Sequence, residues 1–305
     1  MNVLTIKNLS KSFSGHHVIQ NLTFDVPEHS IYGLIGKNGS GKTTTMKMVL
    51  GLLKPENGTI EVCGEPVQYG NSKTNRYVGY LPDVPEFYDY MTPIEYLRLC
   101  GDISGIPHRI ITIRSEELLG LVGLSSAKKR IGTFSRGMKQ RLGIAQALIN
   151  EPTLLICDEP TSALDPIGRI EILEILSKVK GKTTVIFSTH ILSDVERICD
   201  HVAILNEGFI AISGKIADLK KFRSQDRIAV YFSKEEELQA YRSRTHNMLG
   251  NSELLFSEKC LIFKSSQLEN TMLQVMQELI DLHLTPIKIE VLEPTLENLF
   301  LEVVQ

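Results

Sequence analysis

The chain has 305 residues, of which 42% are hydrophobic and 23% charged, with a formal net charge of −3 and a pI near 6.3. This length can bury a substantial core in one large domain or two, and the near-neutral charge argues against nucleic acid as the main partner. No apolar run approaches the roughly 20 residues that cross a bilayer, the N-terminus lacks a signal-peptide layout, and the five cysteines show no C-x-x-C spacing, so we expect a cytoplasmic chain with reduced thiols.

The first segments predict strands with a turn between them. Residues 3–7 alternate apolar and polar side chains, as a half-buried strand does, and residues 18–26 predict a second strand. Residues 11–15 between them predict a polar turn that contains Phe13. This ring either packs within the fold or stacks on a purine ring, and the phosphate-binding motif that follows favours stacking.

Residues 36–43 fit G-x-x-x-x-G-K-[ST], the pattern of a Walker A loop. A short apolar strand is predicted before it and a helix after it, which argues against a glycine-rich turn that matches by chance. The backbone N–H groups of such a loop, with the helix N-terminus, bind polyphosphate. Lys42 is expected to reach the β- and γ-phosphates, and the Thr43 hydroxyl to ligate Mg²⁺. The predicted nucleotide-binding residues of this segment are Gly36, Lys37, Asn38, Gly39, Ser40, Gly41, Lys42, Thr43 and Thr44.

The middle of the chain changes from strands to helices. Residues 59–62 and 76–82 predict strands, and residues from Asp83 to about Thr133 predict a helical insertion into a nucleotide-binding sheet. Thr92-Pro93-Ile94-Glu95 marks the start of the first helix, with proline in the first turn and a capping-box glutamate.

A second motif follows the insertion. Residues 154–157 are a continuous apolar run, as in central parallel strands, and the run ends in Asp158 and Glu159. In a chain with a Walker A loop this pattern predicts a Walker B strand rather than surface acids, because residues 161–165 (Thr-Ser-Ala-Leu-Asp) follow directly. His190 ends the next predicted strand, so we favour a functional role for it over a structural one.

The last part of the chain predicts a second, smaller domain. After a charge-rich joint near Lys221, the predicted elements follow the order β-α-β-β-α-β, the ferredoxin-like arrangement, and end in a helix from Thr295. We therefore expect a nucleotide-binding domain over residues 1–221, with its helical insertion at about 83–133, and an accessory or regulatory α+β domain over residues 222–305.

The motifs at 36–43, 134–138, 154–159 and 162–165, followed by His190, closely resemble the ATP-binding subunit of an ABC transporter over residues 1 to about 220. The resemblance implies an α/β fold with a P-loop NTPase (RecA-like) core and antiparallel β elements. The segment 293–300 is similar to the tail of single-domain ATPases that serve ABC-2-type export permeases, the branch that exports drugs and antimicrobial peptides.

The resemblance also implies roles for single residues. Phe13 would stack on adenine, Asp158 would hold Mg²⁺ through water, Glu159 would act as general base on the attacking water, and His190 would contact the γ-phosphate. The expected catalytic residues are Lys42, Glu159 and His190, and the expected metal ligands are Thr43, Asp158 and Asp83.

By the same resemblance, Ser135 and Gly137 would bind the γ-phosphate of ATP held on a second copy, which implies a homodimer that encloses two ATP molecules. The family has Gly where this chain has Arg136 and Gln where it has Met138. Ser135 and Gly137 keep the hydroxyl and the close backbone approach, so binding in trans is expected to survive. Asp83 stands where a glutamine usually senses Mg²⁺, and this extra carboxylate is expected to slow turnover.

We expect an ATPase that powers export of an unidentified substrate through a separate, multi-helix membrane permease, at the inner face of the cell membrane. Phe87 and Tyr88 either dock against that permease or pack the helical insertion. An ATPase that acts on ribosomes or DNA is disfavoured by the single cassette, by the lack of a heptad segment before Phe134 and by the charge. Two alternatives remain for the C-terminal domain: it binds a small regulatory ligand, or it forms a second dimer contact.

Overall fold

The computed structural model describes residues 1–71, 73–221, 227–245, 254–257, 260–265, 267–292 and 296. The chain divides into two compact units, one containing Met1–Ile216 and a second that begins at Ala217. The first unit carries the motifs at 36–43, 134–138, 154–159 and 162–165 and His190.

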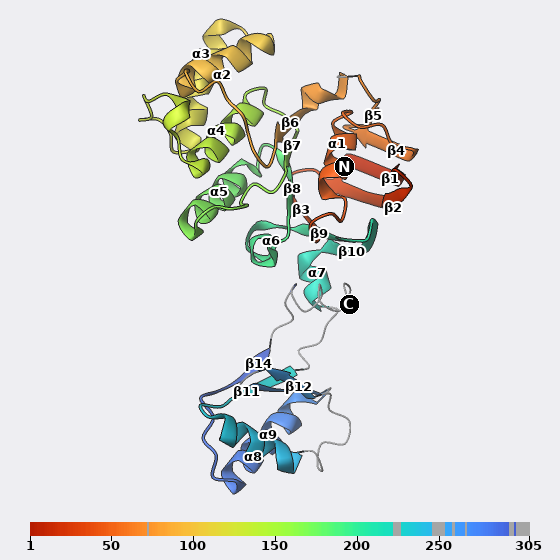
Figure 1. Ribbon diagram of the computed structural model, residues 1–305, viewed down its shortest axis with the longest axis vertical. Helices are drawn as coiled ribbons and strands as arrows, with labels where there is room; N and C mark the ends of the chain where they lie inside the picture. The colour runs from red at the N-terminus through yellow and green to blue at the C-terminus, as the bar shows by residue number, and fades with distance from the viewer. Residues whose placement is uncertain are drawn as a thin grey trace. The chain divides into compact units, whose positions relative to one another are not determined.

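Two sheets build the first unit (Figure 1). An antiparallel sheet has the order β2-β1-β4-β5. Its strands are β1 (Asn2–Phe13), β2 (His16–Pro27), β4 (Asn57–Val62) and β5 (Glu65–Pro66). The second sheet has the order β10-β9-β3-β8-β7-β6 and is parallel except for β10. Its strands are β3 (Ile31–Ile35), β6 (Val78–Leu81), β7 (Leu154–Cys157), β8 (Thr184–Thr189), β9 (His201–Asn206) and β10 (Phe209–Lys215).

Helices cover both faces of the parallel sheet. In Figure 1, α4, α5 and α6 lie on one side of it, and α1 lies with the antiparallel sheet on the other, while α2 and α3 pack beside α4. The helices are α1 (Lys42–Val49), α2 (Pro93–Ile103), α3 (His108–Leu121), α4 (Arg136–Leu148), α5 (Pro166–Val179) and α6 (Leu192–Ile198), with 3₁₀ turns η1 (Lys73–Tyr77) and η2 (Ile131–Thr133). The short helix α7 (Ile216–Lys221) begins at the boundary between the two units.

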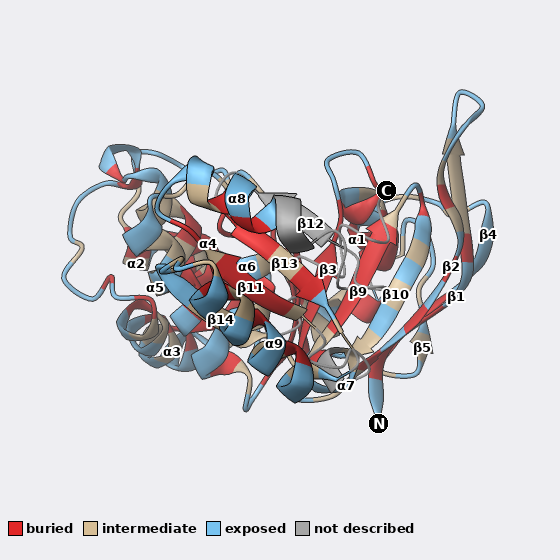
Figure 2. Cartoon of the chain, turned by 90° about the horizontal axis from the view of Figure 1, so that it is seen from below, coloured by how far each residue is buried: buried red, intermediate tan, exposed pale blue. Residues whose placement is uncertain are grey.

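Every residue of β3, β7 and β8 is buried, which explains the mainly apolar sequences of these strands. Figure 2 colours the buried residues of the chain red. Tyr32, Leu34 and Ile156 point to the side of α1 and the antiparallel sheet, where they join one hydrophobic core. On the opposite face α6 approaches very closely: a Cβ on Gly33 would lie 2.9 Å from Cγ1 of Val195. The ends of these strands are therefore held rigidly, which suits them to position functional side chains.

The second unit has its own sheet and core. Its elements run β11 (Arg227–Tyr231), α8 (Glu235–Thr245), β12 (Leu254–Ser257), β13 (Cys260–Lys264), α9 (Leu268–Asp281) and β14 (Lys288–Leu292). The sheet is antiparallel with the order β12-β13-β11-β14, and Val230, Tyr241, Phe263 and Val275 are among its core residues. The expected terminal helix from Thr295 lies outside the described residues except for Leu296.

Two local expectations are wrong. Phe13 is the last residue of β1 and pairs with His16, so the turn shrinks to Ser14 and Gly15, which both adopt positive φ. The strand expected from residue 76 begins only at Val78, because the preceding residues form η1. Pattern alone did not reveal these boundaries.

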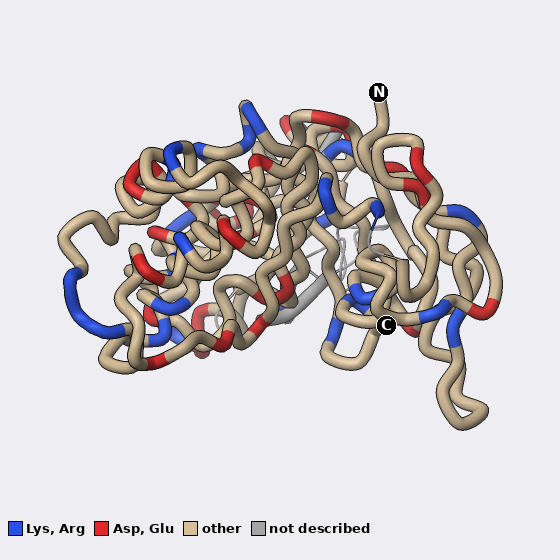
Figure 3. Tube along the Cα trace, turned by 90° about the horizontal axis from the view of Figure 1, so that it is seen from above, with Lys and Arg blue, Asp and Glu red and all other residues tan. Residues whose placement is uncertain are grey.

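Segments of Lys and Arg and segments of Asp and Glu are interspersed along the described trace (Figure 3). Within the described ranges, no helix combines the length and the apolar character that crossing a bilayer requires. All five cysteines are free thiols.

Candidate functional site

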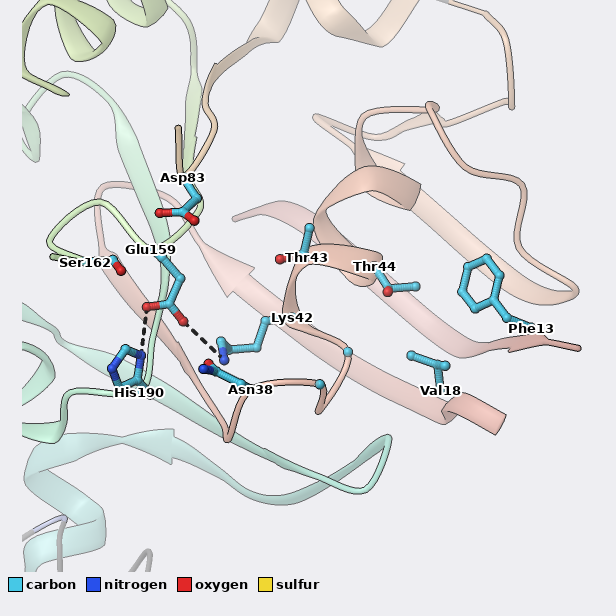
Figure 4. A pocket seen from close by; sticks show the side chains of 12 residues that line it. Phe13, Val18, Asn38, Lys42, Thr43, Thr44, Asp83, Glu159, Ser162 and His190 are labelled. Atoms are coloured by element: carbon cyan, nitrogen blue, oxygen red, sulfur yellow. Dashed lines mark hydrogen bonds and ion pairs between the residues drawn. The ribbon is translucent and has the colours of Figure 1, made fainter. Parts of the chain in front are cut away.

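A cavity of about 530 Å³ lies in the first unit, where β3, β7 and β8 end (Figure 4). Ligands of α/β proteins bind at this carboxyl edge of a parallel sheet. The lining residues are Phe13, Val18, Asn38, Gly39, Gly41, Lys42, Thr43, Thr44, Asp83, Glu159, Ser162 and His190.

The loop that follows β3 is packed so tightly that a side chain at either of two glycines would clash with its neighbours. A Cβ on Gly36 would lie 2.3 Å from the Ser40 hydroxyl and 2.7 Å from the carbonyl oxygen of Leu205. Gly41 has φ +105°, and a Cβ there would lie 2.3 Å from Cδ1 of Ile19. The loop thus leads directly into the N-terminus of α1, whose free N–H groups suit an anion.

Lys42 places a buried ammonium at the floor of this loop. Its side chain is only 5% exposed, and Nζ donates to the carbonyl oxygens of Gly36 at 2.7 Å and Lys37 at 3.2 Å. Nζ also lies 3.2 Å from Oε1 of Glu159 (Figure 4). A buried charge requires such partners, and here the charged partner is the Glu159 carboxylate, which follows β7.

Glu159 connects Lys42 to His190. Its Oε2 lies 3.0 Å from Nδ1 of His190, and its other oxygen, Oε1, makes the ion pair with Lys42 but accepts no hydrogen bond. The backbone of Glu159 adopts φ +48°, a left-handed conformation that favours glycine, and its N–H donates to the Ser188 hydroxyl at 2.8 Å. These contacts fix the carboxylate at the cavity wall.

Asp158 lies behind the cavity rather than in its lining, 3% exposed. Its Oδ1 accepts a 2.6 Å hydrogen bond from the Ser188 hydroxyl, so one serine of β8 contacts both acids that follow β7. Sequence reasoning did not single out Ser188. Its signal was a polar residue next to the end of a fully buried strand, after the apolar run Val185-Ile186-Phe187.

A second buried contact supports this wall. Asp194 of α6 is 2% exposed, and its two oxygens accept hydrogen bonds from the Thr161 hydroxyl at 2.8 Å and from Nε of Arg169 at 2.6 Å. It thereby joins the segment after Glu159 to the helix after His190. No local pattern distinguished Asp194, because its partners lie on other elements.

Asp83 lines the cavity from the end of β6. Partial burial raises the pKa of its carboxyl group, repulsion by Asp158 and Glu159 adds to that rise, and attraction by Arg136 opposes it. Nη2 of Arg136 lies 3.3 Å from Oδ1 of Asp83. Asp83, Asp158 and Glu159 thus lie near one another. Asp83 is paired with Arg136, which lies outside the cavity lining.

Phe13 lies at the opposite end of the cavity, near Val18 and Thr44 (Figure 4). Its ring is 45% exposed, and Nζ of Lys11 stands 5.2 Å from the ring centroid. The cavity therefore has an aromatic end and a charged end, the arrangement that a base joined to phosphates requires.

Ser135 and Gly137 do not line this cavity. Ser135 is exposed and caps α4, its hydroxyl accepting a hydrogen bond from the Met138 N–H at 3.3 Å. The single chain therefore brings together the loop before α1, Glu159 and His190, and leaves the start of α4 outside.

The two aromatic residues after Asp83 differ from each other. Phe87 packs edge-to-face on Tyr96 of α2, with 5.0 Å between ring centroids. Tyr88 is 53% exposed and lies beside the exposed Tyr90. Both rings thus contact Tyr96 of the helical insertion, Tyr88 with 6.4 Å between ring centroids, but Tyr88 also presents about half of its area at the surface.

Comparison with known proteins decides the family. The sequence pattern of the family "ABC transporter" matches residues 19–162. The uncharacterized ABC transporter ATP-binding protein YxlF of Bacillus subtilis (strain 168) is 46% identical over 220 residues, which are 72% of this chain and 73% of that protein. The chain belongs to the ATP-binding proteins of ABC transporters. A likeness to the linearmycin resistance ATP-binding protein LnrL of the same organism, 33% identical, extends over 98% of this chain and 97% of LnrL.

A solved ATP-binding subunit of an ABC transporter has a TM-score of 0.65 and 34% identity with this ABC protein, covering 72% of this chain and 92% of that one. The P-loop fold of the ABC ATPases and the function of an ATP-binding transporter subunit, both expected from the sequence motifs, are confirmed. ATP-binding subunits of this family work with membrane permeases.

Proposed function

We propose that this ABC ATP-binding protein hydrolyses ATP in the described cavity, with Glu159 as the general base. The observation that supports this most strongly is one contact group: the Glu159 carboxylate lies 3.2 Å from the Lys42 ammonium and 3.0 Å from the His190 imidazole. A carboxylate that can act as base, a lysine for the phosphates and a further side chain at the γ-phosphate position, gathered at the carboxyl edge of the parallel sheet, suit phosphoryl transfer.

The two ends of the cavity suit the two ends of ATP. Adenine would stack on Phe13, which is worth about 1–3 kcal/mol for a base on an aromatic ring. The phosphates would lie on the glycine loop, residues 36–43 together with Thr44, at the N-terminus of α1. Lys42 would contact the β- and γ-phosphates.

The proposed reaction is an in-line displacement by water. The water oxygen forms a bond to the γ-phosphorus, the bond to the β–γ bridging oxygen breaks, and the water proton passes to the Glu159 carboxylate. His190 would contact the γ-phosphate, and Ser188 would keep Glu159 in place through the 2.8 Å hydrogen bond to its N–H. Such reactions depend mainly on positioning and on stabilisation of charge.

The residues at the charged end fit a magnesium ion bound together with ATP. Among the described residues no group of three or more His, Cys, Asp or Glu side chains could hold a metal by itself. Mg²⁺ in nucleotide sites needs only one or two protein ligands, because phosphates and waters complete its shell. We propose the Thr43 hydroxyl and Asp158, oriented by Ser188, as these ligands; Asp83 lies nearby, and its Arg136 contact makes it a weaker candidate. The ion would neutralise phosphate charge.

We further propose a homodimer that encloses two ATP molecules. The exposed Ser135 hydroxyl and the Gly137 backbone, outside their own cavity, would bind the γ-phosphate held on the partner, and Asp165 would link the two sites. A two-fold axis then places each α4 start against the opposite glycine loop.

In the cell this dimer would act at the inner face of the membrane and power export through a separate permease of the ABC-2 type. The full-length likeness to the linearmycin resistance ATP-binding protein supports an export role. The exposed Tyr88 is a candidate contact for the permease. The second unit, whose strand order is β12-β13-β11-β14, supports the proposal of a ferredoxin-like accessory domain.

The decisive experiment is Glu159→Gln, which keeps the size of the side chain and removes the base. ATP binding is expected to persist, phosphate release to fall at least about 100-fold, and an ATP-bound dimer to accumulate. Phosphate release, nucleotide binding and light scattering measure these outcomes. Glu171→Gln is the matched control, because Glu171 is 45% exposed on α5 and pairs with Arg141 outside the cavity. Near-normal hydrolysis by Glu159→Gln would refute the assigned base.

A further inference from the structure

One face of α4 holds the segment that carries Asp83. Arg136, Gln140 and Gly143 follow an i, i+4, i+7 spacing and therefore lie on the same side of the helix. Nε2 of the fully buried Gln140 donates to the backbone oxygen of Asp83 at 2.6 Å. A Cβ on Gly143 would lie 2.5 Å from Cδ1 of Leu81, so α4 packs directly against the end of β6. The backbone at Asp83 is thus attached to α4 independently of the Asp83 carboxylate.

The carboxylate itself contacts only the first residue of that face among the described contacts. Nη2 of Arg136 lies 3.3 Å from Oδ1 of Asp83, and the two side chains are 44% and 48% exposed. Ion pairs with this exposure contribute little to folding stability. The Arg136–Asp83 pair therefore acts mainly on the charge of the cavity that Asp83 lines.

The Arg136–Asp83 pair changes the balance of charge in the cavity. Asp83 and Glu159 both line the cavity, and Figure 4 shows their carboxylates near the same end. The Lys42 ammonium already lies 3.2 Å from Glu159, so it does not offset Asp83. Without Arg136, the second carboxylate would face the polyphosphate with its charge uncompensated.

We propose that Arg136 is a positioning residue that holds and neutralises the Asp83 carboxylate, so that the cavity of the same chain accepts the phosphates of ATP. This inference rests on the proposed function, since it takes ATP as the ligand. Arg136 directly follows Ser135, so the same contact attaches the start of α4 to the chain's own nucleotide cavity. The two departures from the family pattern, Asp83 after β6 and Arg136 at the start of α4, therefore compensate each other.

The test is a double-mutant cycle on the full chain, with the dissociation constant of MgATP as the readout. Arg136→Ala is expected to weaken MgATP binding about fivefold at low salt, because an unpaired carboxylate then repels the phosphates. In the Asp83→Asn background the same Arg136→Ala change is expected to have no effect. Arg136→Lys, which keeps the positive charge, is expected to recover most of the affinity.

Lys139→Ala is the matched control. Lys139 lies in the same turn of α4 and pairs at 3.4 Å with Asp89, which does not line the cavity, so its loss is expected to leave MgATP affinity unchanged. The Arg136→Ala effect is also expected to shrink near 1 M salt, where the Debye length is about 3 Å. A purely structural role for Arg136 would not show this salt dependence.

Two results would overturn the inference: equal weakening by Arg136→Ala in both backgrounds, or equal weakening by Lys139→Ala. Failure of the parent chain to bind MgATP would instead refute the proposed function, and the two failures are thus distinguishable.

Discussion

The glycine loop at residues 36–43 and the start of α4 at Ser135 differ in their relation to the cavity, although both are proposed to bind the same phosphate group. The loop, Lys42 and Glu159 come together within one chain, whereas the Ser135 hydroxyl is exposed and only caps its own helix. This difference is what the proposed dimer requires, since each chain would then contribute a nucleotide pocket and, separately, a surface for the pocket of its partner. The variants below separate these two contributions.

The largest effect is expected from Lys42→Ala. The change removes the cation proposed to contact the β- and γ-phosphates and leaves Glu159 without its partner, so ATP affinity is expected to fall by about 2–4 kcal/mol, or roughly 30- to 1,000-fold. Calorimetric titration with MgATP measures it. Lys47→Ala, an exposed change on the same helix, serves as the control. Unchanged ATP binding by Lys42→Ala would refute the assignment of the loop.

Mixing the Ser135→Ala and Lys42→Ala variants tests directly whether the two regions belong to one site that two chains share. Ser135→Ala is expected to lower hydrolysis about 10- to 100-fold, because it removes a hydrogen bond to a charged phosphate, while ATP binding to the single chain is kept. A mixture with Lys42→Ala is expected to recover up to about a quarter of the parent rate, since half of the dimers then contain one intact composite site. A destabilised helix cannot produce such recovery. If the mixture stays inactive, the two-chain site is wrong.

Phe13→Ala tests the aromatic end of the pocket. The loss of stacking is expected to weaken ATP binding by about 1–3 kcal/mol, and to leave the binding of inorganic triphosphate, which has no base, nearly unaffected. Phe209→Ala is the control, because Phe209 is similarly exposed, at 48% against 45%, and lies outside the cavity. Equal losses for ATP and triphosphate would indicate that Phe13 supports the loop and does not contact the base.

The smallest effect concerns Asp83 and pH. Because the pKa of Asp83 is raised in the folded chain, its ionisation opposes folding, and this penalty appears as pH rises through the raised pKa. Asp83→Asn is expected to increase the unfolding free energy at pH 7 by a few tenths of a kcal/mol and to lose this advantage toward about pH 4. Urea unfolding at both pH values measures it, with Asp89→Asn as the exposed control. Destabilisation at pH 7 would show that the Arg136 attraction outweighs the repulsion.

Sequence reasoning found the parts of the site whose signals are contiguous. The glycine loop, the apolar strand ending in Asp158 and Glu159, and the strand ending at His190 are local patterns, and the order of β3, β7 and β8 brought them to one edge.

The supporting contacts were not predictable for a physical reason. Ser188, Asp194 and Gln140 are common polar residue types, and each acts on a partner at least 25 residues away in the chain. Only tertiary packing decides which of many serines, aspartates and glutamines is buried beside a functional acid. The pairing of Arg136 with Asp83 was missed for the same reason, although both residues had been noted as departures from the family pattern.

The ion pair of Lys42 with Glu159 makes any incoming ligand a competitor for an ammonium that already has a counter-ion. A nucleoside without phosphates has no anion that could replace Glu159 beside Lys42. A short nucleotide that does not reach Lys42 would also leave the Lys42–Glu159 pair intact. In the proposed mechanism, a triphosphate that reaches Lys42 would replace the Glu159 carboxylate as its counter-ion and so free that carboxylate beside the γ-phosphorus. If the proposed mechanism holds, the pocket therefore selects for phosphate-chain length by anion exchange at Lys42, and Glu159 becomes available as a base only once ATP is bound.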